Sequence, residues 1–455
     1  MSNERAESEV SERRAWYFYD WANSAYFTTV TAVLFAPYLT SVAETAACGE
    51  PGTTDDPCNT DLLIGGVSIS PGSLVFYVIT ISTLVSAVVV PLVGALADGS
   101  PSKRRMMCTY AWVGSAATMA MVFITGSNWQ LGAVLLVISS VCVAASLCIY
   151  HSILVDIASP DERDAVSSRG WALGYLGGGI LLAINLVVVT AHDALGMDTQ
   201  TAVRVSLLSA GVWWAGFTII PFRGLRDRPP AIRHRQGTND LVRRSFGQLW
   251  VTLRGARAYP RTLLFLAAFL FYNDGIQTVI ASASVYGDKE LGFDTAFLMT
   301  AILLVQFVAF GGALLFGRLA RRTGTKKMIV LGLVVWMLIV SFGYFLPERN
   351  TVMFIMLAIG IGVVLGGTQA LSRSFFSQLI PKGLEAEYFA LYQACERGTS
   401  WIGTLLFGVV HQLTDSYRVA IFALIAFFVI GLALLIPLEV RRAIREAGNL
   451  EPKVV

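Results

Sequence analysis

The stretch Trp16–Tyr26, read WYFYDWANSAY, opens the first long apolar run, which continues to about Val42. It places Asp20 and Asn23 at or near the depth of the lipid hydrocarbon. A carboxylate at that depth costs a few kcal/mol unless it is paired or solvated, so an ionisable residue there marks a candidate functional site. A second stretch, Phe271–Gly275, repeats the order Phe, Tyr and then an Asp. In the alternative interpretation, Asp20 lies in the headgroup zone and only caps the first helical turn.

The composition around this stretch is that of a membrane protein. Of 455 residues, 55% are hydrophobic and 14% are charged, and the mean hydropathy is +0.62. Soluble globular chains carry about 25% charged residues. Apolar runs of about 20 residues predict membrane-spanning helices, and we count twelve: 16–42, 72–97, 106–126, 131–155, 170–191, 203–222, 262–286, 295–317, 327–346, 351–372, 388–412 and 418–438. The predicted fold class is therefore an all-α membrane protein.

The twelve runs form two sets of six. The predicted organisation is a cytoplasmic segment 1–15, a six-helix half 16–222, a basic linker 223–261, a second six-helix half 262–438 and a tail 439–455. The linker is either a solvated connection or, around Trp250, contains a short amphipathic helix (Phe246–Leu253) on the inner leaflet.

The distribution of Lys and Arg predicts the orientation. Basic residues gather on the side of the termini, which the positive-inside rule assigns to the cytoplasm; outside the linker they are Lys103, Arg104, Arg105, Arg321, Arg322, Lys326, Lys327, Arg441 and Arg442. The expected location is the plasma (inner) membrane, with both termini cytoplasmic and the chain a monomer.

The segment Glu44–Ser70 is predicted to face outside. It contains five acidic residues and no Lys or Arg, together with Cys48 and Cys58. An oxidising compartment favours a disulfide between these two cysteines, and two free thiols are the alternative. The chain contains no C-x-x-C and no His-spaced cluster, so we expect no metal site and no cofactor.

An internal repeat supports the two halves. Gly94-x-x-x-Asp98, followed by Lys103 and Arg104, returns half a chain later as Gly317-x-x-x-Arg321, followed by Lys326. Two six-helix halves in the same orientation are typical of major facilitator transporters.

Several motifs resemble known families. Gly94–Arg104, read GALADGSPSKR, resembles the loop signature between helices 2 and 3 of the major facilitator superfamily, and GRLARRTGTKK (from Gly317) resembles its second copy, with Arg321 where the Asp would be. YDWANSAY (Tyr19–Tyr26), the ASPDER and GWALGYLGGG motifs within Ala158–Gly179, and GGTQALSRSFFSQLIP (Gly366–Pro381) resemble the vacuolar amino-acid effluxers, or autophagy-related permeases, and their bacterial relatives. The resemblance implies a transporter and suggests amino-acid export.

The fifth span carries Gly170, Gly174 and Gly178, which form a flat helix face. Such a face lets another helix approach closely. It resembles the helix 5 signature of proton-linked facilitator antiporters, with Tyr175 in place of their Pro, and helix packing with no bearing on transport direction is the alternative.

Polar groups inside the spans are the candidate binding residues. Asp274 lies near the middle of its span and is the expected proton-coupling or substrate-binding carboxylate; a structural role at a helix kink is the alternative. In a facilitator, helices 1, 4, 7 and 10 line the cavity, which implies that Asp20, Tyr150 and Arg373 converge on a cytoplasmic gate. His151 is expected at a solvated helix end. The full set is Asp20, Asn23, Tyr26, Tyr150, Asn273, Asp274, Gln277, Gln369, Arg373, Glu396 and Arg397.

These residues provide the chemistry for a zwitterion. Arg373 or Arg397 can bind a carboxylate through two hydrogen bonds, and Asp20 or Asp274 can face an ammonium. An ion pair within the protein is the alternative for any one pair. We therefore predict a secondary transporter for a small molecule, such as an amino acid, coupled to protons and embedded in lipid.

Other classes of protein receive less support. The chain has no Walker sequence, no H-E-x-x-H and no G-x-S-x-G, which argues against an ATP-driven pump and against a membrane enzyme acting on lipid. Nucleic acid is not an expected partner. A receptor or regulator that keeps a transporter fold remains the other hypothesis.

Overall fold

The computed structural model describes residues 2–52, 58, 60–229, 257–293, 295–397, 400–414 and 416–454. The N-terminal part contains α1 (Ser2–Ala25), η1 (Tyr26–Leu34), α2 (Phe35–Cys48), β1 (Leu62–Ile64), β2 (Val67–Ile69), α3 (Pro71–Asp98), α4 (Lys103–Ala120), η2 (Met121–Phe123), α5 (Trp129–Ile157), α6 (Arg163–Thr190) and α7 (Thr199–Gly224). The C-terminal part contains α9 (Pro260–Lys289), α10 (Thr295–Thr323), α11 (Thr325–Tyr344), α12 (Thr351–Gln378), α13 (Glu385–Arg397), α14 (Ser400–Thr414), α15 (Tyr417–Ala423), α16 (Ile425–Leu435) and α17 (Val440–Glu446).

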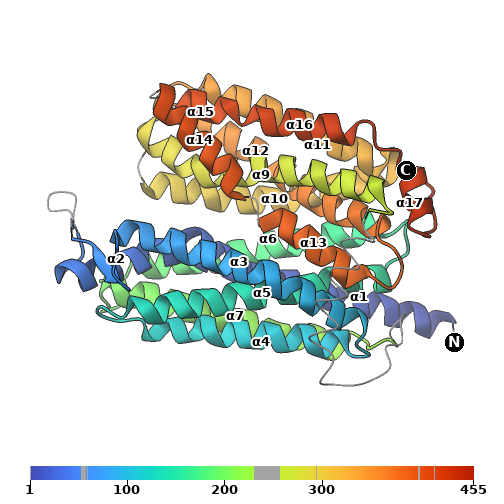
Figure 1. Cartoon of the computed structure of the whole chain (residues 1–455), viewed down its shortest axis with the longest axis horizontal. Helices are drawn as coiled ribbons and strands as arrows, with labels where there is room; N and C mark the ends of the chain where they lie inside the picture. Colours follow the sequence, from blue (N-terminus) through green and yellow to red (C-terminus); the bar gives the residue numbers. More distant parts are fainter. Residues whose placement is uncertain are drawn as a thin grey trace.

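The helices form two groups that lie against each other (Figure 1). One contains α1 to α7 and the other α9 to α16, and both chain ends lie at the same end of the bundle (Figure 1). We call this the terminal end, and the opposite end, which carries the antiparallel pair β1–β2, the hairpin end. Contacts of α6 with α10 and α12, and of α13 with α3 and α5, join the two groups.

Eleven helices in the described part of the chain are long and apolar enough to cross a membrane. The span predicted at 388–412 differs, because the structure has two shorter helices there, α13 and α14, and does not describe residues 398–399 between them. The span predicted at 418–438 is divided into α15 and α16 at Leu424. The predicted linker lies mostly outside the described residues, and Phe246–Leu253 lies wholly outside them.

The first span is longer than its apolar run predicts. One continuous helical segment runs from Glu7 to Cys48, and helix α1 already begins at Ser2. Helix α1 therefore continues through most of the predicted segment 1–15, because charged residues need not end a helix. Asp20 consequently lies well inside a helix instead of at its start.

Local sequence explains several helix ends. Pro71 and Pro260 occupy first-turn positions, where the missing N–H has no helical partner to lose. The Asp198 side chain caps α7 by accepting from the Thr201 N–H at 3.1 Å. Gly324, at φ +97°, separates α10 from α11, and this backbone conformation favours glycine.

The nine residues of η1 form a π-helix within the first span. π-helical turns are uncommon and often occur at functional sites. Here the segment lies directly between α1 and α2 and contains Tyr26, Phe27, Val30 and Thr31, all of which line a cavity described below.

Candidate functional site

A buried ion pair connects the two halves. Arg373 on α12 donates to the Asp20 carboxylate on α1, with Nη1 and Nη2 each 3.1 Å from Oδ2. The Arg373 residue is 0% exposed and Asp20 is 6% exposed. Removing one partner would leave an uncompensated charge in a low-dielectric interior, so each residue depends on the other for its burial between the halves.

Hydrogen bonds complete the surroundings of this pair. Tyr150 on α5 donates to Asp20 Oδ2 at 2.7 Å. Arg373 donates from Nε to the Ser167 hydroxyl at 2.9 Å and from Nη2 to the Ser167 carbonyl at 2.8 Å. The structure therefore brings Asp20, Tyr150 and Arg373 together.

Three aromatic rings enclose the guanidinium. The Arg373 Cζ atom lies 4.9 Å from the centre of the Trp16 ring, 5.5 Å from Tyr150 and 5.4 Å from Trp171. Trp16 also stacks on Tyr150 with centroids 4.3 Å apart. Aromatic faces stabilise a desolvated cation, so Trp16, the first residue of WYFYDWANSAY, helps to bury the pair.

The glycine face of α6 allows α1 to approach this closely. A Cβ atom on Gly170 would lie 2.5 Å from Asp20 Oδ2, and one on Gly174 would lie 2.7 Å from Ser24 Oγ. A Cβ on Gly178 would lie 2.7 Å from Thr28 Cγ2. All three distances are too short for a side chain, so this face is a tight contact between helices.

The loop signature of the first half forms a second connection at the terminal end. The two oxygens of Asp98, at the end of α3, accept from the N–H groups of Ala386 and Glu387 at 3.0 Å each. These N–H groups belong to the first turn of α13 in the other half, where a negative charge is favourable. Lys103 also pairs with Asp98 at 3.0 Å, and a Cβ on Gly94 would lie 2.7 Å from the Ala386 carbonyl oxygen.

The second copy has its acid on the other helix. Gly317 of α10 faces Ser168 of α6, and Asp164 of α6 accepts from the Thr325 hydroxyl at 2.6 Å. Arg321, which replaces the Asp of the motif, interacts electrostatically with Asp164. In this copy the acid, Asp164, is therefore on α6 of the N-terminal half, and the base, Arg321, is on α10 of the motif itself.

The remaining basic residues of the two copies bind carbonyl groups. Arg104 donates to the carbonyl oxygens of Phe222 and Leu225 at 3.1 and 3.2 Å. Lys326 donates to those of Ile436 and Leu438 at 2.7 and 2.9 Å. Each therefore holds the end of the last long helix of its own half.

An acid outside the spans strengthens the terminal end. Glu162, in the turn between α5 and α6, accepts from Arg13 Nη1 and Nη2 at 2.7 and 2.8 Å. The hydrogen bonds from Arg13 hold the pKa of Glu162 below its ordinary value. The ASPDER motif therefore connects the middle of α1, at Arg13, to this turn.

A cavity of about 530 Å³ lies between the halves, on the hairpin side of the Asp20–Arg373 pair. Such a volume is typical of small-molecule sites. η1, α2, α3 and α5 line one wall and α9, α13 and α14 line the other. The lining includes three predicted site residues, Tyr26, Gln277 and Glu396.

Glu396 is the charged side chain among the described residues of this lining. Gln393 donates to Glu396 Oε2 at 3.0 Å and lies 3.3 Å from Nδ1 of His151 in the other half. His151 is 3% exposed, so the prediction of a solvated helix end was wrong. The reason is that α5 continues to Ile157, which places His151 inside the seam against α13.

Asn273 and Gln369 form a hydrogen-bonded chain to the backbone of Glu396. Gln369 donates to Asn273 Oδ1 at 3.0 Å, and Asn273 donates to the backbone carbonyl of Glu396 at 3.0 Å. Asp274 is elsewhere: it is 1% exposed and accepts from the Gly403 N–H of α14 at 2.9 Å. It is not among the described residues that line the cavity.

Asn23 makes a contact within its own helix, Tyr26 of the lining contacts α5, and the Arg397 side chain is not described. Asn23 donates to the Tyr19 carbonyl at 2.6 Å, and the Tyr26 hydroxyl lies 2.9 Å from Ser140 Oγ. Arg397 ends α13, and its side chain lies outside the described part of the chain.

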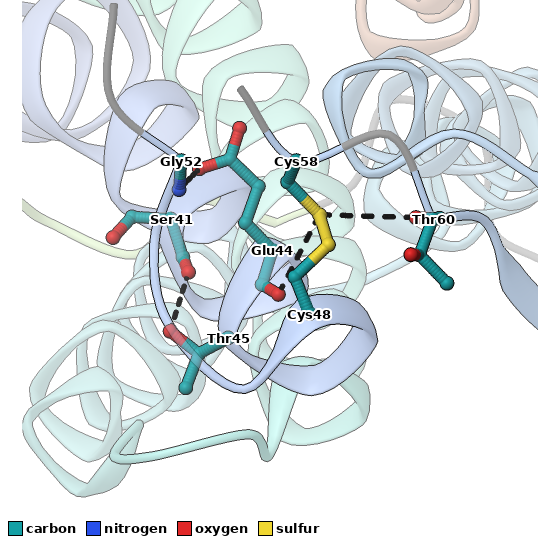
Figure 2. Close-up of a disulfide and its surroundings, with 7 residues drawn as sticks. All are labelled: Ser41, Glu44, Thr45, Cys48, Gly52, Cys58 and Thr60. Carbon is teal, nitrogen blue, oxygen red and sulfur yellow. Dashed lines mark hydrogen bonds between the residues drawn. A yellow bond between two sulfur atoms is a disulfide. The ribbon is translucent and has the colours of Figure 1, made fainter. Parts of the chain in front are cut away.

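Cys48 and Cys58 form a disulfide at the hairpin end (Figure 2). Glu44 lies beside it and accepts from the Gly52 N–H at 3.1 Å (Figure 2). The bond attaches the end of α2 to the segment that leads into β1, so the first span and the start of α3 are connected outside the helical bundle.

Sequence reasoning missed two residues of the site. Ser167 lies three positions before Gly170, and Gln393 lies three positions before Glu396, so each shares a helix face with a residue that was found. A search for polar residues one turn away from each candidate would have identified both.

These observations define a class of protein. The fold is that of the major facilitator transporters, and two solved structures superpose well on this chain. The proton:xylose symporter XylE, bound to 6-bromo-6-deoxy-D-glucose, gives a TM-score of 0.69 over 95% of this chain and 96% of its own, at 9% identity. A bacterial homologue of the iron transporter ferroportin, in an outward-facing state, gives 0.65 over 94% and 98%, at 15% identity. At such identities the likeness concerns the fold.

Within this class, the chain belongs to the vacuole effluxer Atg22-like family, whose model matches residues 8–448. It is 30% identical over 445 residues to the uncharacterized MFS-type transporter YxiO of Bacillus subtilis, covering 97% of this chain and 98% of YxiO. It is 25% identical to autophagy-related protein 22-2 of Aspergillus niger, covering 88% and 81%. The chain is therefore a membrane transporter of a small solute and not an enzyme.

Proposed function

We propose that this chain exports a small solute with an amino group, such as an amino acid, in exchange for protons. Relationship to vacuole effluxers supports export, and the Lys and Arg distribution supports a plasma-membrane orientation with both termini in the cytoplasm. In this orientation the terminal end is cytoplasmic and the cavity belongs to an outward-facing state.

The observation that carries this proposal is a cavity whose described lining contains one carboxylate and which is closed on its terminal side by an ion pair between the halves. Glu396 lines the cavity, while Asp20 and Arg373 connect the halves on its terminal side at 3.1 Å. Alternating access requires this pair to separate when the cavity opens to the cytoplasm. We therefore assign Asp20, Tyr150 and Arg373 to the cytoplasmic gate, and Glu396 to the binding of solute and proton.

Competition for Glu396, the one carboxylate of the described lining, accounts for the exchange of solute against protons. Glu396 cannot hold a proton and pair with an ammonium group at the same time, so one must leave before the other binds. In the outward-facing state, a proton binds Glu396 and displaces the solute to the outside. In the inward-facing state, a new solute molecule binds Glu396 and displaces the proton to the cytoplasm. The position of Asp274 against the α14 backbone favours Glu396 over Asp274 for this role.

The proposal is tested in proteoliposomes with a panel of amino acids. Two activities are measured, exchange of labelled solute without a gradient and accumulation driven by a pH gradient. We expect Glu396→Gln to lose gradient-driven accumulation, because the amide does not titrate, and Asp274→Asn to retain it. Normal accumulation by Glu396→Gln at every pH would contradict the assignment.

Loss of accumulation only in Asp274→Asn would transfer the coupling role to that residue. Absence of flux for every amino acid, with a folded protein, would contradict amino-acid export.

A further inference from the structure

The two walls of the cavity differ in chemistry. The described C-terminal wall is made of small and polar side chains, which are Gln277, Ala281, Ala390, Gln393, Ala394, Glu396 and Thr404. Every Val, Ile, Leu, Phe, Tyr and Pro side chain among the described lining residues comes from the N-terminal wall, which also carries the hydroxyl groups of Thr31, Ser82, Thr83, Ser86 and Ser140. A ligand that satisfies both walls has a polar, cationic end and an apolar body.

From this division we propose that the transported solute is recognised by its ammonium group and its apolar body, and that a carboxylate is dispensable. An aliphatic or aromatic amine is then a sufficient ligand. This inference rests on the proposed function, because it concerns the same cavity, and it narrows the chemical class of the solute.

The polar wall is built to present a carboxylate. Gln393 donates to Glu396 Oε2 at 3.0 Å, and the Glu396 backbone carbonyl is held by Asn273 at 3.0 Å. These bonds fix the side chain and the helix turn that carries it. A fixed carboxylate beside amide groups binds a primary ammonium through charge-assisted hydrogen bonds.

The apolar wall gives the body of the ligand a place. The apolar residues that line the cavity on this side are Phe27, Val30 and Phe35 of the first span and Val75 and Ile79 of α3. Val30 and Phe35 are 0% and 2% exposed, so packing against neighbouring helices fixes part of this wall. Removal of an alkyl or aromatic body from water against such a surface is favourable.

Arg373 is a buried cation that could bind a solute carboxylate, but it is already paired with Asp20. Arg373 is 0% exposed, binds Asp20 and Ser167, and is not among the described lining residues. Recruiting it for a solute carboxylate would break the closed seam. Among the described lining residues, Glu396 is therefore the charged group that can bind a solute, and it binds an ammonium end.

Three ligands with the same branched carbon body test the inference. Isopentylamine has only the ammonium group, leucine has both charged groups, and 4-methylpentanoate has only the carboxylate. Binding to the purified full-length protein is measured by calorimetry near neutral pH. We expect isopentylamine to bind within about tenfold of leucine or more tightly, and 4-methylpentanoate not to bind.

Variants assign the binding to the cavity. Glu396→Gln should weaken binding of isopentylamine by at least about tenfold, whereas Glu348→Gln, an exposed acid at the hairpin end, should leave it unchanged. Binding of leucine without isopentylamine would overturn the inference, because it would require a cation for the carboxylate. Failure of all three ligands to bind would also overturn it.

The outcome is separable from the proposed function. Proton-driven flux of amino acids without binding of isopentylamine would remove this inference while keeping the proposed exchange. Binding of isopentylamine with no flux of any amine in proteoliposomes would keep the recognition site and contradict the proposed exchange.

Discussion

The two Phe-Tyr segments, Phe18–Asp20 and Phe271–Asn273, occupy corresponding places at the start of each half but make different contacts. Both are surrounded by stacked rings: Trp16 and Tyr150 lie 4.3 Å apart, and Phe269 and Tyr392 lie 4.1 Å apart. The first segment carries a charge that pairs across the halves. The second carries an amide that bonds within its own half, to Gln369 and to the Glu396 backbone.

This difference separates two tasks between related segments. A charged pair that must break defines whether the halves are together. A neutral amide can support the cavity without competing for protons or solute. In the proposed mechanism, the two segments share a scaffold, and the difference between Asp20 and Asn273 separates the gate from the support of the cavity.

The largest expected effect breaks the charged side of the comparison. Asp20→Asn leaves Arg373 buried without a counter-charge, which should lower the free energy of unfolding by about 3–5 kcal/mol. Denaturant unfolding in detergent measures it. The matched control is Glu290→Gln, which removes the partly exposed partner of Arg418 (2.7 Å) and should cost less than about 1 kcal/mol. Equal losses in the two variants would show that the Asp20 pair has no special weight.

The next effect tests how closely the first segment is held. Gly174→Leu places a side chain where Ser24 Oγ lies 2.7 Å from the Cβ position, which should destabilise by about 1–3 kcal/mol or prevent folding. Folded yield and thermal stability are measured. Gly216→Leu is the control, because nothing lies within 4 Å of a Cβ there. A Gly174→Leu protein of normal yield and stability would refute the tight contact.

A smaller effect addresses the neutral segment. Asn273→Leu removes two hydrogen bonds and should cost about 1–3 kcal/mol. It should weaken solute binding while leaving the Asp20–Arg373 contact intact, so the variant should still close its terminal end. Accessibility of a cysteine introduced at Ser377 measures that closure. Exposure of this cysteine in Asn273→Leu, as in Asp20→Asn, would remove the distinction between the segments.

The smallest effect concerns the contact between Arg13 of α1 and Glu162. Because Arg13 lowers the folded-state pKa of Glu162, the pair stabilises the protein above the ordinary pKa of 4.5, and this contribution is lost as pH falls through the lowered value. Glu162 is 43% exposed, so screening limits the effect to less than about 1 kcal/mol. Glu162→Gln should flatten this part of the stability profile between pH 6 and 3. An unchanged profile would show that the pair contributes nothing.

Residue patterns predicted the features that depend on local sequence. Apolar runs indicated the spans, the glycine spacing indicated the face of α6, and the repeated Gly94 and Gly317 motifs indicated two halves. The meeting of Asp20, Tyr150 and Arg373 came from the resemblance to facilitators, because hydropathy alone placed Asp20 near the membrane edge.

Other features depend on how the halves meet. The burial of His151 and the contacts of Gln393 arise from α13 crossing to the other half, which no periodicity within one helix encodes. Hydropathy also missed the early start of the first helix, because charged residues before Trp16 continue it into water. Asp274 was expected in the cavity from its depth, but depth does not determine which side of a helix faces the cavity.

Burial of the Asp20–Arg373 pair also affects how the transporter responds to ionic strength. Dissolved ions weaken attraction between exposed charges over a Debye length of about 10 Å at 0.1 M salt. They cannot enter around a guanidinium that is 0% exposed and enclosed by three aromatic rings. While the halves are closed, the attraction within this contact is therefore screened much less than that between surface charges, and salt acts mainly on the surface charges and on the separated pair.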